Sequence, residues 1–111
     1  MKSNRLMIAL ITVIALSVSA LQADVAKGQK LYLKKLKSKC GMNGAKMAAT
    51  HTQDEWQELK ENGTLGDDLI KQCPKAEKII RTKKFEQSVI PDLYDFFHEY
   101  ANDSGNVPSC G

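Results

Sequence analysis

Three cysteines are the residues of this 111-residue sequence with the clearest chemistry: Cys40, Cys73 and Cys110. In an oxidising compartment two of them would pair as a disulfide and one would be left over. All three pairings are open. We favour Cys40 with Cys73, because Cys110 stands one residue from the end of the sequence and chain ends are commonly disordered. A bridge that closes about 30 residues would stabilise the fold by roughly 3 kcal/mol.

The other candidate chemical groups carry no recognisable catalytic pattern. His51 precedes a predicted helix cap, His98 lies beside an apolar stripe, and Met42 and Met47 are typical fillers of a hydrophobic core. The sequence has no Cys-x-x-Cys motif, no zinc-ligand spacing, no glycine-rich phosphate loop and no known nucleophile motif. We therefore expect a protein that is not an enzyme.

The first 23 residues predict a secretory signal peptide. Two basic residues precede an apolar run over residues 6–18, which has the length of a signal sequence and is too short to span a bilayer. Cleavage after Ala20 or after Ala23 fits the small-residue rule, and we favour the second because a charged, helix-like stretch begins at Asp24. An uncleaved signal anchor is the alternative. We expect a mature domain, residues 24–111, in the periplasm, with no transmembrane segment after cleavage.

Charge is distributed unevenly along this mature part. The formal net charge of the whole sequence is only +3, but basic residues gather early and acidic residues late: Lys27, Lys30, Lys34, Lys35, Lys37, Lys39 and Lys46 against Asp92, Asp95, Glu99 and Asp103. One interpretation is that these are simply solvated helix faces. The functional interpretation is that the lysine-rich first helix steers an acidic protein partner or a membrane surface. Because the lysines are not interleaved with aromatic residues, we expect no nucleic-acid binding.

The spacing of apolar residues predicts an all-α domain. An amphipathic helix is expected over residues 24–39, with Tyr32 on its apolar face. Gly28 on that face would cost about 1 kcal/mol in a helix interior, so it indicates a close approach by another element. Pro91 suits the first turn of a final helix with an apolar stripe: Ile90, Leu93, Tyr94, Phe97, Tyr100 and Ala101. We expect the two terminal helices to cross near Gly28 and Tyr32.

Shorter elements are predicted between these helices. Thr52 and Glu55 have the spacing of a capping box and open a helix that carries Trp56 into the core. Another short helix should end before Pro74. Residues 75–89 are highly charged with few apolar anchors, so we predict a loop with one helical piece.

This order of features resembles the class I cytochromes c. The resemblance is carried by the stretch Gly28-Gln29-Lys30-Leu31-Tyr32, by a central glycine-containing loop and by an aromatic last helix, and it covers nearly the whole mature part. It implies a cytochrome c-like small helical domain with packed N- and C-terminal helices. It also implies an association with respiratory electron transfer.

The haem-attachment motif of that family, Cys-x-x-Cys-His-Gly, is absent. In register with the glycine-to-tyrosine stretch, Leu36 and Lys39 replace its two cysteines, Cys40 replaces its histidine, and only Gly41 matches. Residues 74–91 contain no methionine to serve as the distal ligand. We therefore expect no covalently attached haem.

Haem held without covalent attachment would need other ligands. Cys40 as a thiolate, His51 or His98 as an imidazole, and Met42 or Met47 as a thioether are chemically possible ligands, although disulfide formation competes with a thiolate at Cys40. Cys40, His51 and Met47 are the residues that we would test. The first functional hypothesis is an exported cytochrome c-like protein associated with electron transfer. The alternative is a haem-free, disulfide-stabilised periplasmic binding or assembly module that contacts its partner through the basic first helix. A thiol-redox protein that uses the leftover cysteine is a third, weaker hypothesis.

Overall fold

The computed structural model of this chain describes residues 24–109, which begin in helix α1, residues 24–35. The predicted signal peptide, residues 1–23, and Cys110 lie outside the described residues. A turn at Leu36 separates α1 from α2, Lys37–Cys40, so the single helix predicted over residues 24–39 is wrong in its last part. At the buried Leu36 φ is −118°, still within the right-handed region, and Gly41 ends α2 in the left-handed conformation, with φ of 69°.

Three further helices follow: α3 Gly44–Ala48, α4 Gln53–Glu61 and α5 Leu65–Gln72. The capping box predicted for α4 is confirmed. The Glu55 N–H donates to Thr52 Oγ1 at 3.1 Å, and the Thr52 N–H donates to Glu55 Oε1 at 2.8 Å. Helix α5 ends before Pro74, as predicted.

The loop predicted over residues 75–89 is wrong, because this segment is mostly helical. A 3₁₀ turn, Pro74–Ala76, leads into α6, Glu77–Ile80, and a π-helical segment, Phe85–Val89, runs directly into α7, Ile90–Glu99. The side chains of Ile80, Phe85 and Val89 are buried in the core. Packing of these anchors therefore stabilises a helical path in a segment whose other residues are mostly polar and exposed.

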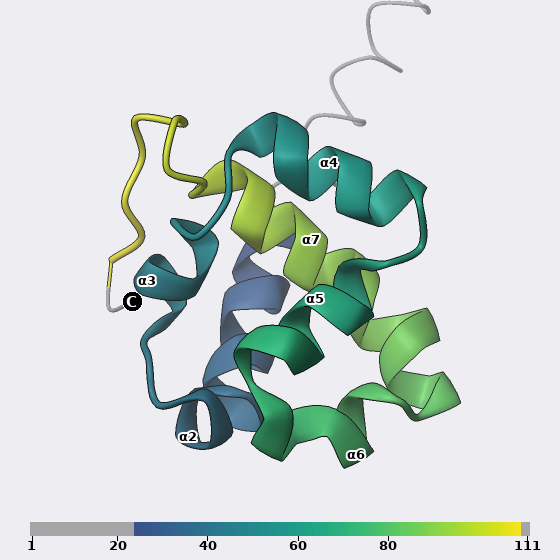
Figure 1. Cartoon of the computed structure of the whole chain (residues 1–111). Helices are drawn as coiled ribbons and strands as arrows, with labels where there is room; N and C mark the ends of the chain where they lie inside the picture. Colours follow the sequence, from purple (N-terminus) through teal and green to yellow (C-terminus); the bar gives the residue numbers. More distant parts are fainter. Residues whose placement is uncertain (1–23, 110–111) are drawn as a thin grey trace, which may run out of the picture.

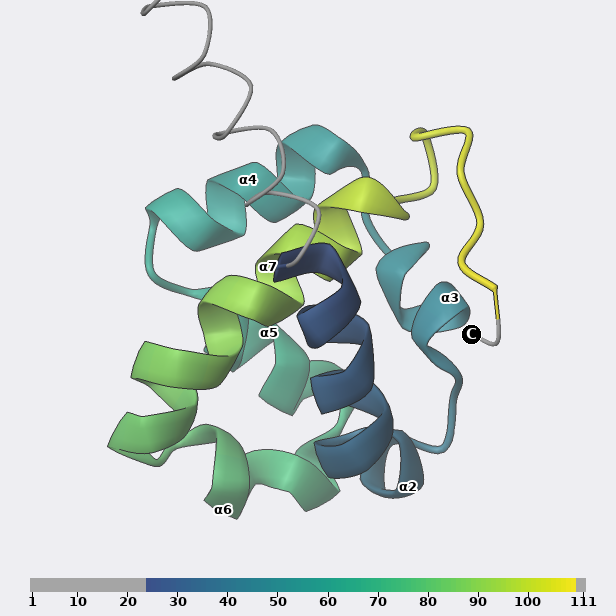
Figure 2. The same ribbon diagram turned by 180° about the vertical axis from the view of Figure 1, so that it is seen from behind.

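Helix α1 packs across α7, as predicted, and Figure 2 shows the crossing from behind. A Cβ atom on Gly28 would collide with the Asp92 carbonyl oxygen and would lie 2.8 Å from the Phe96 Cβ. One turn further along α1, the Tyr32 ring lies 6.0 Å from the Phe97 ring, edge to face. Glycine at position 28 is what lets the two backbones come this close.

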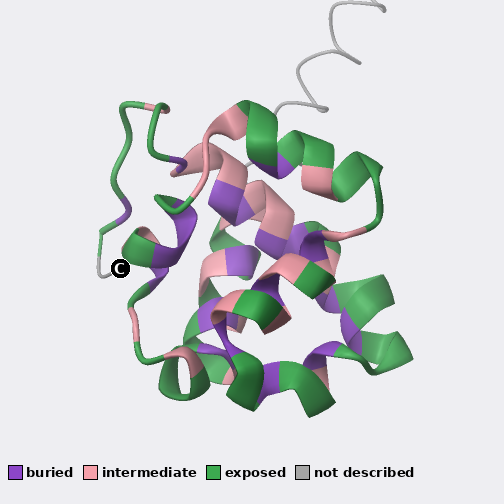
Figure 3. Cartoon of the chain, in the orientation of Figure 1, coloured by how far each residue is buried: buried purple, intermediate pink, exposed green. Residues whose placement is uncertain are grey.

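Helix α7 lies at the centre of the compact all-α domain, in contact with α3, α4 and α5 as well as α1 (Figure 1). Buried residues gather on the faces of these helices that turn inward (Figure 3). Trp56 is buried in this core as predicted, where it stacks on Phe97 with ring centroids 4.6 Å apart and donates its indole N–H to the Ala48 carbonyl at 2.9 Å. Within residues 24–109, none of the helices has the length and apolar character that a membrane crossing requires.

Candidate functional site

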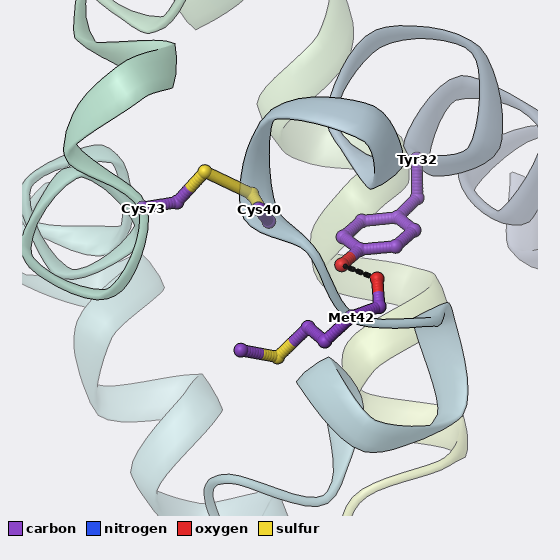
Figure 4. The surroundings of a disulfide bond; sticks show 4 residues. All are labelled: Tyr32, Cys40, Met42 and Cys73. Carbon is purple, nitrogen blue, oxygen red and sulfur yellow. Dashed lines mark hydrogen bonds between the residues drawn. A yellow bond between two sulfur atoms is a disulfide. The ribbon is translucent and has the colours of Figure 1, made fainter.

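Cys40 and Cys73 form a disulfide bond, which is the pairing favoured from the sequence (Figure 4). Cys40 is the last residue of α2, and Cys73 directly follows α5. Their Cα atoms lie 4.9 Å apart across 33 positions of sequence. The bond links α2 to the C-terminal end of α5. While it is formed, Cys40 has no thiolate to offer as a ligand.

Met47 and Met42 both serve the packing of the domain. Met47, on α3, has 0% of its surface exposed and belongs to the central core. Met42 is half-buried in the loop between α2 and α3, and its carbonyl accepts a hydrogen bond of 2.7 Å from the Tyr32 hydroxyl. The thioether of Met47 therefore has no open side from which a cofactor could approach.

His51 connects three parts of the fold. Its Nε2 lies 3.0 Å from Asp68 Oδ2 on α5, and its ring meets the Trp56 ring edge-on at 4.6 Å. Its backbone carbonyl accepts from the Asn102 N–H at 3.1 Å, just beyond α7. Gln72 donates to the same Asp68 oxygen at 2.8 Å. This network holds the junction of α3 and α4 against α5 and the end of α7.

The three candidate haem ligands do not form a common site. A hollow beside His51 is lined by glutamates, Leu59 and Asn62, and neither Cys40 nor Met47 contributes to its wall. The Cys40 sulfur is bonded to Cys73, the Met47 side chain is enclosed, and the His51 Nε2 faces a carboxylate. As arranged, these donors do not fit a set of axial ligands for haem.

Three lysines form what we call the basic face: Lys30, Lys34 and Lys37, on α1 and α2. All three are exposed, and none has a carboxylate within 4.0 Å among the described residues. Lys27 differs, because its Nζ lies 3.4 Å from Asp92 Oδ2. The positive charge of the basic face is therefore not neutralised within residues 24–109.

A shallow hollow of about 460 Å³ opens beside the basic face. We call it the Leu33 hollow, after the first of the residues that line it: Leu33, Lys37, Ser38, Gly41, Met42 and Asn43. Leu33 is 37% exposed, and in the described part of the chain the only other large exposed apolar residue is Val107. Sequence reasoning missed this hollow. The available signal was an apolar residue at position 33, off the stripe that Tyr32 and Leu36 bury.

A second cleft, of about 500 Å³, lies between α5, α6 and the start of α7. Its wall includes four aliphatic side chains: Leu65, Ile70, Ile80 and Ile90. At its rim Arg81 lies 3.1 Å from Glu77 and 3.7 Å from Asp67, and the other charged residues of the wall, Lys60 and Glu86, are opposite in sign. This cleft has volume and apolar surface, but the charges in its wall are of both signs and do not favour a ligand of one charge.

Three aspartates form an acidic cluster between the first turn of α1 and α7, far along the chain from the disulfide at the end of α2. Carboxylate oxygens of Asp24, Asp92 and Asp95 lie within 4.8 Å of one another. Burial, and then the neighbouring Asp24 carboxylate, raise the pKa of Asp95 above its ordinary value. Lys27 offsets part of the charge through Asp92.

Comparison with known proteins finds no match for this chain among family models, curated sequences or solved structures.

Proposed function

We propose that the mature chain is a haem-free, disulfide-stabilised binding module that works in the periplasm and recognises an acidic protein partner through the basic face. The proposal is supported by a difference between two kinds of candidate group on α1 and α2, the cysteine and the lysines. The Cys40 sulfur is committed to a structural bond, whereas the lysines of the basic face have no partner among the described residues. Surface charge that serves no internal contact is available to steer association.

We place this module in a cytochrome c-like arrangement of helices. The support comes from the crossing of α1 and α7, where Gly28 meets the Asp92 backbone and Tyr32 meets the aromatic residues of α7. These residues belong to the same stretch that carries the resemblance in the sequence. The core beside the crossing is filled by Trp56, Phe97 and Met47, all completely buried.

An electron-transfer protein with haem is the second candidate, because the same crossing of α1 and α7 favours a relative of the cytochromes c. Such a protein would need axial ligands other than Cys40, Met47 and His51, because these three residues are engaged in a disulfide, in the core and with Asp68. The two candidates differ in colour and mass. We expect the protein purified from its native compartment to be colourless, with the mass of residues 24–111 reduced by the hydrogens lost in one disulfide. A Soret absorption band would contradict the haem-free proposal.

Charge reversal tests the basic face directly. We expect the oxidised protein to bind poly-glutamate at low ionic strength, and binding to weaken as salt is added. The triple variant Lys30→Glu, Lys34→Glu and Lys37→Glu should lose about tenfold or more in affinity. The matched control is Lys71→Glu, Lys75→Glu and Lys78→Glu, which reverses three exposed lysines on α5, the 3₁₀ turn and α6. Equal loss in both triple variants would mean that net charge alone drives binding, and would contradict the proposal.

A further inference from the structure

We propose that the partner presents an acidic amphipathic segment, which places one apolar side chain in the Leu33 hollow while flanking carboxylates pair with the basic face. This inference rests on the proposed function and adds to it the location of the contact and the chemistry of the partner.

The first step of the argument is the exposed apolar surface. Leu33 lies on α1 next to the buried Tyr32, yet it is 37% exposed and forms one wall of the hollow. The half-buried Met42 forms another part of the lining. Methionine adapts its shape to different partners, and a single apolar anchor in a pocket commonly supplies much of the energy of an interface.

The second step is charge. Lys37 lines the hollow, and Lys34 lies one residue beyond Leu33 on α1. No carboxylate is among the residues that line the hollow. An apolar hollow alone would accept an apolar side chain from many proteins. Lys37 in its wall, with the other lysines of the basic face close to Leu33 in the sequence, repels basic segments and attracts acidic ones.

The third step is rigidity, because a preformed site loses less entropy when it binds. The loop that carries Met42 is held on two sides, as Figure 4 shows. The Tyr32 hydroxyl donates to the Met42 carbonyl at 2.7 Å, and Cys40, two residues earlier, is bonded to Cys73. The disulfide and the buried tyrosine therefore shape the docking site as well as the core.

A protein segment fits this surface better than a membrane does. Peripheral helices enter a membrane with a face of several apolar residues, whereas α1 exposes only Leu33 among its large apolar side chains in residues 24–35. A second copy of the chain would have to use one of the two large exposed apolar residues of the described part, Leu33 or Val107. We treat both as outcomes of the test.

The probe is a synthetic peptide of roughly 15 residues, with a central leucine flanked by glutamates at helical spacing. Binding is followed by amide chemical shifts of the isotope-labelled, oxidised mature chain. We expect the shifts to concentrate at Leu33, Lys37 and Met42. Replacing the leucine of the peptide by serine should weaken binding about tenfold. Leu33→Ser in the protein should have a similar effect, while the matched control Val107→Ser should have none.

The outcomes separate this inference from the proposed function. If the serine peptide binds as well as the leucine peptide, and the basic-face variant still fails to bind, the hollow is not the anchor site and the inference is overturned while the proposed function stands. If neither peptide binds and poly-glutamate does not bind either, both are overturned. Tighter binding to phosphatidylglycerol vesicles than to the peptide would overturn both in favour of a membrane. Self-association that Leu33→Ser or Val107→Ser abolishes would overturn the inference in favour of a second copy.

Discussion

Gly28 lies so close to Asp92 that any side chain at position 28 would collide with the Asp92 carbonyl oxygen. The contact sets the distance between α1 and α7, and with it the position of Tyr32 against the aromatic residues of α7.

The substitution Gly28→Ala should therefore destabilise the protein by about 1–3 kcal/mol, because the strain at the crossing exceeds the gain in helix propensity. Gly66→Ala is the matched control, since a Cβ there would lie 3.5 Å from Ile80, an ordinary contact. That variant should be neutral or slightly more stable. Urea unfolding of both variants measures the difference, and equal stability of the two would contradict the role of the crossing.

Loss of the disulfide should lower the free energy of unfolding by about 3–4 kcal/mol, because Cys40 and Cys73 are 33 positions apart and the bond restricts the unfolded chain. The comparison is between the oxidised wild type and the double variant Cys40→Ser and Cys73→Ser. Cys110→Ser, which leaves the bond in place, is the control. Unchanged unfolding midpoints in the double variant would show that the bond adds no stability.

Alkaline pH should destabilise the protein through Tyr32. Burial raises the pKa of Tyr32 to about 12, against about 10 in an unfolded chain. A folded pKa above the unfolded one gives stability that is complete below about pH 10 and is lost as pH rises towards about 12. Tyr32→Phe should lower the free energy of unfolding by about 1 kcal/mol at neutral pH, because it removes the hydrogen bond to the Met42 carbonyl. As pH rises, this variant should lose less stability than the wild type. Urea unfolding across this pH range measures the difference. If the free energy of unfolding falls equally with pH in the variant and the wild type, Tyr32 is ruled out as the source.

Asp95 provides a test at acidic pH. Its pKa is raised, chiefly by burial and then by Asp24, so the folded state favours the protonated carboxyl. The associated stability is complete at low pH and is lost as pH rises through the folded pKa. Asp95→Asn should thus stabilise the neutral-pH protein by roughly a few tenths of a kcal/mol, with the gain vanishing in acid. Thermal unfolding at several pH values measures this gain in stability. The control is Glu86→Gln, which removes a carboxylate at an exposed position. A gain that is the same at all pH values would point to packing instead.

The sequence by itself determined those features that depend on neighbours within a turn or two of helix. The capping box of Thr52 and Glu55 involves residues three apart, and the stripe of α7 repeats at helical spacing. The crossing at Gly28 was also predictable, because a glycine on an apolar helix face signals a close neighbour and the other terminal helix offered the longest matching stripe. The favoured cysteine pairing came from the position of Cys110 near the sequence end, and not from any knowledge of where the cysteines lie in space.

Only the tertiary structure decided the features that depend on contacts between distant segments. Residues 75–89 follow a helical path because Ile80, Phe85 and Val89 are buried in the core, and the pattern of charges in this segment gave no such signal. Cys40, Met47 and His51 are all plausible ligands by chemistry, but their partners Cys73, the central core and Asp68 come from other elements. The Leu33 hollow likewise exists because the disulfide and Tyr32 hold the Met42 loop beside α1. Periodicity reports which face of a helix is apolar, whereas packing between helices settles which apolar residues the core covers and which remain at the surface.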